Sequence, residues 1–161
     1  MHLTHTSSTV AGVTMLGVSL YGLANGIAQG EVPLARIAMY KVCLPEGFSD
    51  VDLLARMDEA INDRVDLISI SIRGDGTSYF DDPIGIGAFH AMMKGIWTTC
   101  SGGNNSPYAN TVENAAPWIM TVSASSMDKQ FSTPVKLGNG IETYLSPFFL
   151  FGTVYKVLGS V

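Results

Sequence analysis

Three segments of the chain have residue patterns typical of helices. Small residues predict a helix over about residues 2–13. Ser49, with Asp52 three positions later, resembles a capping box, and an apolar stripe at helical spacing follows it, comprising Leu53, Leu54, Met57, Ala60 and Ile61. Pro83 suits the first turn of a third helix, which the pattern extends to about Lys94.

Strand patterns alternate with these helices. Residues 36–42 alternate loosely, residues 65–72 are rich in β-branched side chains, and short apolar runs occupy 96–100 and 119–124. A Gly-rich stretch before the first strand predicts a loop, through Gly22, Gly26 and Gly30. This alternating order of strands and helices is typical of a parallel sheet whose strands are joined by right-handed crossover connections. The sequence therefore predicts an α/β fold, a parallel sheet with helices on both faces.

Composition narrows the function classes. With 47% hydrophobic and 14% charged residues, the chain suits strands buried on two sides. The net charge of -5 is dispersed, which argues against nucleic acid as a partner. Cys43 and Cys100 are too few for a disulfide framework and lack C-x-x-C spacing, so we expect two core thiols, no metal and no cofactor. No stretch predicts a membrane span, and the first residues lack a signal-peptide pattern.

Three strings carry chemistry. Residues 2–12 read H-L-T-H-T-S-S-T-V-A-G, residues 71–74 read S-I-R-G, and residues 101–107 read S-G-G-N-N-S-P. In this order they resemble the histidine block, the substrate-binding edge and the oxyanion block of subtilisin-like serine proteases, above all the plant cucumisin-type subtilases. The resemblance covers about residues 2–140, so the domain expected there is a partial subtilisin-like peptidase domain.

The resemblance implies roles for particular residues. It makes His2 the general base and Asn104 the oxyanion-hole amide of a serine endopeptidase, with a polypeptide as substrate and an extracellular location. The substrate-binding residues that it implies are Ser71, Ile72, Arg73, Gly74, Ser101, Gly102 and Gly103. An extended polypeptide would pair with such an edge through main-chain hydrogen bonds.

The chain departs from the family pattern in several places. No block for the triad aspartate precedes His2, and the serine block G-T-S-M is absent, so we expect no activity from the chain alone. Leu3 and Arg73 replace glycines of the family. Asn104-Asn105-Ser106 forms a glycosylation sequon, and a glycan there would block the oxyanion hole. The divergent apolar tail, residues 141–161, suggests a truncated or misread gene product that self-associates.

Other interpretations stay open. In isolation His2 and His5 are most often helix surface or core, and His90, the one further imidazole available to a metal, is expected to be a core histidine. Ser69 and Ser71 could be buried hydroxyls. A noncatalytic interaction or regulatory fragment of a protease is the main rival function. A nucleotide-binding fold is disfavoured, because residues 85–90 do not complete a G-x-G-x-x-G loop.

Overall fold

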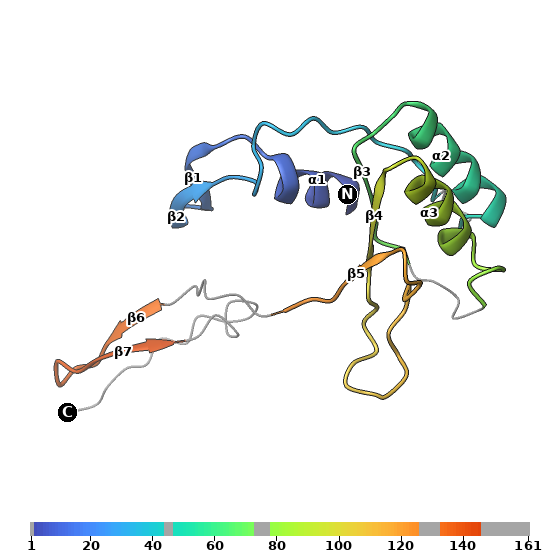
Figure 1. Cartoon of the computed structure of the whole chain (residues 1–161). Helices are drawn as coiled ribbons and strands as arrows, with labels where there is room; N and C mark the ends of the chain where they lie inside the picture. Colours follow the sequence, from blue (N-terminus) through green and yellow to red (C-terminus); the bar gives the residue numbers. More distant parts are fainter. Residues whose placement is uncertain (1, 44–46, 73–77, 126–132, 146–161) are drawn as a thin grey trace. The chain divides into compact units, whose positions relative to one another are not determined.

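The computed structural model describes residues 2–43, 47–72, 78–125 and 133–145. Its contacts divide the chain into two compact units, residues 1–36 with 126–161 and residues 37–125. The first unit contains α1 (His2–Ala11), β1 (Met15–Leu20), β2 (Leu23–Ala28), β6 (Thr133–Lys136) and β7 (Glu142–Leu145). The second contains α2 (Asp50–Asn62), β3 (Leu67–Ile70), α3 (Pro83–Met93), β4 (Trp97–Ser101) and β5 (Met120–Val122) (Figure 1).

A three-stranded parallel sheet in the order β3-β4-β5 forms the second unit's centre. Leu67 pairs with Trp97 and Ile70 with Cys100, while Thr99 of β4 pairs with Met120 of β5. The predicted parallel sheet is thereby confirmed. Because neighbouring parallel strands end at the same edge, the residues that follow β3 lie beside those that follow β4.

Side-chain caps begin both helices of this unit. The Ser49 hydroxyl accepts from the Asp52 N–H at 3.1 Å and starts α2, as the capping pattern predicts. The Asp82 carboxylate accepts from the N–H groups of Ile84 and Gly85 at 3.0 and 3.1 Å, and Pro83 follows it in the first turn of α3. The sequence prediction of the two helices is confirmed, although it did not include the Asp82 cap.

Both helices pack into one core on the same face of the sheet. Ile68 and Ile70 of β3 face this core, whereas Leu67 and Ser69 point to the other face. The remaining buried apolar residues are Leu53, Met57, Ala60, Ile84, Ala88, Ala91, Ile96, Cys100, Ala116 and Ile119. On the opposite face, by strand register, four large apolar side chains are exposed: Leu67, Trp97, Met120 and Val122.

The first unit contains hairpins. β1 and β2 pair antiparallel from Met15 with Ala28 to Leu20 with Leu23. The prediction of a loop through Gly22, Gly26 and Gly30 is therefore wrong. Tyr21 and Gly22, at φ +51° and +85°, form the tight turn that joins the two strands. β6 and β7 form a second antiparallel hairpin.

Several local predictions need correction. Residues 36–42 form no strand, and Tyr40 instead donates its hydroxyl hydrogen to Asp63 at 2.7 Å, which raises the pKa of Tyr40. Packing against the core, without a ladder partner, explains the apolar pattern of that segment. The side chains of Cys43, Ser69, Ser71 and His90 are exposed rather than buried. Cys100 is buried, as expected.

Candidate functional site

The main chain after β4 is held on both sides. Gly102 donates its N–H to the Val122 oxygen at 2.9 Å, which continues the pairing of β4 with β5. Glu113 donates its N–H to the Gly102 oxygen at 3.1 Å. The start of the loop that carries Asn104 is therefore fixed by the main chain.

Positions 102 and 103 of this loop are glycines for two different structural reasons. A Cβ atom at Gly102 would lie 2.6 Å from Ser123 Oγ, so a larger residue would force the Ser123 hydroxyl to move. Gly103 adopts φ +87°, and a Cβ there would lie 2.9 Å from Glu113 Cδ. Glycine is the residue that fits a positive φ without strain. The motif at residues 101–103 thus specifies the path of the chain into Asn104.

Asn104 is exposed at the carboxyl end of β4. Within the parts of the chain that the structure describes, its side-chain amide has no hydrogen-bond partner, whereas the next residue, Asn105, donates to Glu113 Oε1 at 3.4 Å. The Asn104 amide is therefore available to donate to a bound ligand.

The predicted substrate edge lies beside this loop. Ser71 is exposed and Ile72 is half-buried directly after β3, whose last residue pairs with Cys100. The structure therefore brings Ser71 and Ile72 together with Ser101, Gly102 and Gly103 at one edge of the sheet. Arg73 and Gly74 lie outside the described residues.

One residue of this edge was missed from the sequence. Asn114 is about 6% exposed and donates its Nδ2 hydrogens to the oxygens of Ile72 at 3.0 Å and Ser101 at 2.9 Å. It stands in the polar connection between β4 and β5. A single asparagine there gives no periodic signal, because its role depends on two partners far away in sequence.

Burial makes Cys100 a poor nucleophile. Its thiol lies on β4 directly before Ser101, and burial, with a smaller contribution from the charge of Asp82, raises the pKa of Cys100 to about 12. Near neutral pH the sulfur stays protonated, and the thiolate is the reactive form of cysteine. Cys100 therefore does not replace a serine nucleophile.

His2 belongs to the other compact unit, where it is the first residue of α1. Hydroxyls along this helix bond back to carbonyls of the preceding turn, since Ser8 and Thr9 both donate to the His5 oxygen, at 2.8 and 3.0 Å. The neighbouring Leu3 side chain is 42% exposed, so the residue that stands in place of the family's glycine adds apolar surface beside His2.

The order of these elements and motifs matches a known family. The model of the subtilase family (Peptidase_S8) matches residues 1–149, which is nearly the whole chain. The chain belongs to the subtilase family. Subtilases are serine-type peptidases, so the resemblance drawn from the three motifs is confirmed.

Plant subtilases are among the most similar curated proteins. Subtilisin-like protease SBT4.15 of Arabidopsis thaliana is 62% identical over 140 residues, which cover 87% of this chain and 18% of the relative. Subtilisin-like protease SBT4.14 of the same plant is 55% identical over 140 residues, covering 86% of this chain and 19% of the relative. The chain therefore spans about a fifth of the length of these relatives.

A solved structure supports the fold. Sphericase superimposes with a TM-score of 0.51 at 23% identity, over 76% of this chain and 38% of its own. At that identity the likeness concerns the fold alone, and it confirms the subtilisin-like α/β class.

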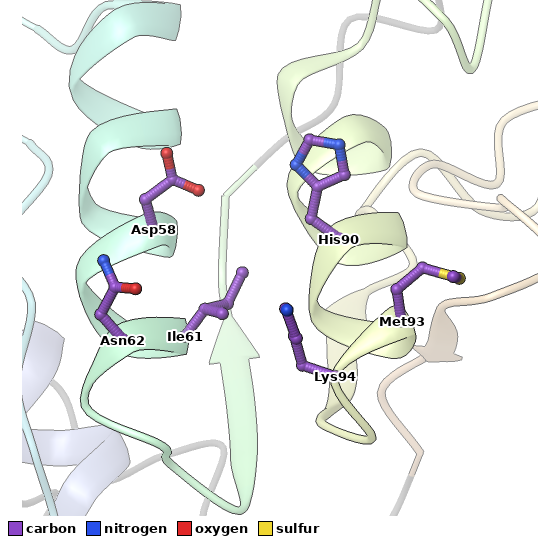
Figure 2. A pocket seen from close by; sticks show the side chains of 6 residues that line it. All are labelled: Asp58, Ile61, Asn62, His90, Met93 and Lys94. Atoms are coloured by element: carbon purple, nitrogen blue, oxygen red, sulfur yellow. The ribbon is translucent and has the colours of Figure 1, made fainter.

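The second unit also has an open groove between α2 and α3 (Figure 2). Its volume is about 450 Å³, and its lining consists of Asp58, Ile61, Asn62, His90, Met93 and Lys94. Apart from His90, none of them was singled out as a site residue. Across residues 2–43, 47–72, 78–125 and 133–145, no group of three His, Cys, Asp or Glu side chains is arranged to hold a metal ion. No helix in those ranges is long and apolar enough to cross a membrane.

Proposed function

We propose that this chain supplies the histidine and oxyanion parts of the active site of a serine-type endopeptidase. His2 acts as the general base that removes the proton from a serine hydroxyl and later protonates the leaving amine. Asn104 donates its amide hydrogen to the oxyanion that forms on the scissile carbonyl. The substrate class is polypeptide, and the location of the complete enzyme is extracellular, as in the family.

The placement of Asn104 carries the proposal. Its amide is exposed and unpartnered among the described side chains, at the carboxyl end of the central strand β4. Ligands of open α/β sheets bind outside the carboxyl ends of the strands. Gly103, at φ +87°, sets the direction in which the chain enters Asn104. The main chain that carries Asn104 is fixed by Gly102 and Gly103, and an exposed amide at this place can donate to an oxyanion that forms beside it.

The neighbouring main chain supplies the substrate edge. Ser71 and Ile72 leave β3 beside Ser101 and Gly102, at the end of β4, and Gly103, at φ +87°, turns the chain toward Asn104. We propose that a polypeptide pairs with these two segments, together with Arg73 and Gly74. Main-chain pairing gives affinity with little demand on sequence, so side-chain pockets would set the cleavage preference.

The chain as given does not complete the reaction. Its sequence holds neither the triad aspartate block nor the serine block. Without a serine nucleophile no acyl-enzyme forms, and the catalysis left after removal of a triad is small beside that of the intact enzyme. We therefore propose that hydrolysis requires those two parts from elsewhere.

The test is a graft. Residues 2–140 of this chain replace the matching segment of SBT4.15, which is 62% identical over 140 residues. Two changes accompany the graft: Leu3→Gly restores the family's glycine, and Ser106→Ala removes the sequon while it keeps Asn104. We call this protein the restored protease. In it, His2→Ala should abolish turnover, and Asn104→Ala should lower kcat by about 100- to 1,000-fold with a smaller effect on KM.

Two controls make the graft decisive. Asn105→Ala changes the neighbouring amide, which contacts Glu113 and not the proposed oxyanion, and should leave kcat nearly unchanged. Unchanged turnover in the Asn104→Ala variant would show that a different group stabilises the oxyanion. An inactive restored protease, folded by circular dichroism, would contradict the proposed roles of both His2 and Asn104.

A noncatalytic role is the second candidate. The exposed apolar face that includes Leu67, Trp97 and Met120 favours association with another protein surface. Titration of the chain into the active relative separates the candidates, because a regulatory fragment changes its turnover in a saturable way. A chain that leaves the turnover constant has no such role.

A further inference from the structure

Asn114 joins two strands beyond the end of their ladder. The β3–β4 pairing ends with Ile70 opposite Cys100. Past this point, Asn114 Nδ2 lies 3.0 Å from the Ile72 oxygen and 2.9 Å from the Ser101 oxygen. The one amide therefore bridges the segment that follows β3 and the last residue of β4.

The chemistry of the two partners fixes the orientation of this amide. Both are carbonyl oxygens, which only accept, and a side-chain NH₂ group has two hydrogens to give. The Asn114 Oδ1 atom is buried and has no partner among the described residues. Since an unpaired buried acceptor destabilises the fold, the two donated hydrogen bonds are what favour the buried position of this side chain.

The segment that carries Asn114 is itself anchored. Thr121 donates its hydroxyl hydrogen to the main-chain oxygen of Asn114 at 2.6 Å. Trp118 donates its Nε1–H to the main-chain oxygen of Gly85 at 2.8 Å. The Trp118 ring also meets Phe89 edge to face, with ring centroids 5.3 Å apart. Asn114 adopts φ +53°, a conformation that asparagine tolerates better than most residues.

We propose that Asn114 is a positioning residue of the substrate cleft. Its amide sets the spacing between the predicted substrate edge at Ser71 and Ile72 and the loop that leads from Ser101 to Asn104. A polypeptide that pairs with both segments needs this spacing to be fixed before it binds. The inference rests on the function proposed above and adds a residue that touches neither the substrate nor the oxyanion.

Two substitutions distinguish the role of the Asn114 side-chain amide from the role of its backbone conformation. Asn114→Asp keeps the shape and the tolerance for positive φ, but a carboxylate cannot donate to the two carbonyl oxygens. Asn114→Gly removes the side chain and suits φ +53° even better. If the residue served only its backbone conformation, Asn114→Gly would behave like the parent. Trp118→Phe is the matched control, because it loosens the same segment and leaves the bridging amide in place.

Kinetics of the restored protease give the first readout. A long peptide reaches the edge at Ser71 and Ile72, whereas a small activated ester does not. For the peptide, each Asn114 variant should raise KM about tenfold. This is the free-energy effect expected when the one or two hydrogen bonds that align the two segments are lost. For the ester, which does not reach that edge but still uses the oxyanion amide of Asn104, kcat/KM should fall less than for the peptide. Trp118→Phe should affect both substrates in equal proportion.

Amide hydrogen exchange gives an independent readout on the full chain, fused to a soluble carrier protein. Exchange in peptides that cover Ile72 and Ser101 should accelerate about tenfold in both Asn114 variants and stay near the parent rate in Trp118→Phe. Equal losses for peptide and ester, or parent-like behaviour of Asn114→Gly, would overturn the proposal. If the unaltered restored protease is inactive, the proposed function fails, and the exchange rates alone then decide whether Asn114 holds the two segments.

Discussion

Gly30 donates its N–H to the main-chain oxygen of Gly12 at 2.8 Å, so the chain that leaves β2 lies directly against the end of α1. Glu31 and Val32 continue the contact by donating to the oxygens of Thr9 and Val10, at 3.0 and 2.8 Å. Helix carbonyls near a C-terminus lack partners within the helix, and this segment supplies them. The helix that begins at His2 is thus held at its far end by residues 30–32.

Gly30→Ala should therefore loosen α1. A Cβ atom at Gly30 would overlap the Gly12 nitrogen and lie 2.8 Å from the Ala11 nitrogen, and these main-chain atoms cannot rotate away as a side chain would. We expect the free energy of opening α1, measured by amide hydrogen exchange, to fall by about 1–3 kcal/mol. Gly26→Ala is the control, because nothing lies within 4 Å of a Cβ there. Equal protection of α1 in the two variants would contradict the packing described here.

The two thiols should differ sharply in reactivity. Cys43 is exposed, whereas burial raises the pKa of Cys100 to about 12. In the native chain at pH 8, an aromatic disulfide reagent should label Cys43 at least about 1,000-fold faster than Cys100. In guanidinium chloride the two rates should converge. Rapid labelling of both thiols without denaturant would mean that the Cys100 thiol is not buried.

The same thiol predicts a pH dependence of stability. The pKa of Cys100 is raised in the fold above its unfolded value, so its contribution is fully present below about pH 9. As the pH rises from about 9 to about 12, the unfolded chain loses this proton first, and the free energy of unfolding falls. Cys100→Ala should remove that part of the decline. Hydrogen exchange of the amides in β4 across this range tests it, and an unchanged slope would contradict the assignment.

The uncovered sheet face should make the chain self-associate. Trp97, at 69% exposure, stands on this face beside Leu67 and Met120, and an apolar patch of this kind promotes association. Trp97→Thr should lower the apparent mass by light scattering, whereas Phe80→Thr, which removes a side chain 84% exposed elsewhere, should not. A monomeric parent chain would refute the prediction.

The tail should add to this association. Its composition combines two aromatic and β-branched runs with one positive charge between them, which is typical of aggregation-prone segments. Deleting the residues after Tyr144 should improve solubility without producing a cooperative unfolding transition, because the sheet face stays uncovered. A soluble monomer with one sharp two-state melt would show that the chain is a self-sufficient domain.

Local signals explain what could be predicted from the sequence. The cap at Ser49 and the proline at position 83 act within a few residues, so α2 and α3 follow from nearby chemistry. The motifs at residues 2–12, 71–74 and 101–107 identified the family because the three blocks occur in order. The β1–β2 hairpin was missed, since glycines at positive φ, such as Gly17 and Gly22, obscure the alternation of strands.

Long-range relationships account for the rest. Asn114 binds carbonyls 42 and 13 residues earlier in the chain, and no short window of sequence contains both. The exposed position of His90 likewise depends on how α2 and α3 meet. The placement of Asn104 could be anticipated, because the strand before it and the glycines around it are local features.

Labelling with a serine-directed fluorophosphonate tests most directly the proposal that this chain holds the base and the oxyanion amide of a subtilase but no nucleophile. The chain alone should take up no label, because it offers no activated serine. The restored protease should take up one label per molecule, and His2→Ala should abolish that uptake. Stoichiometric labelling of any serine in the chain alone, or full labelling of the restored protease without His2, would contradict the account.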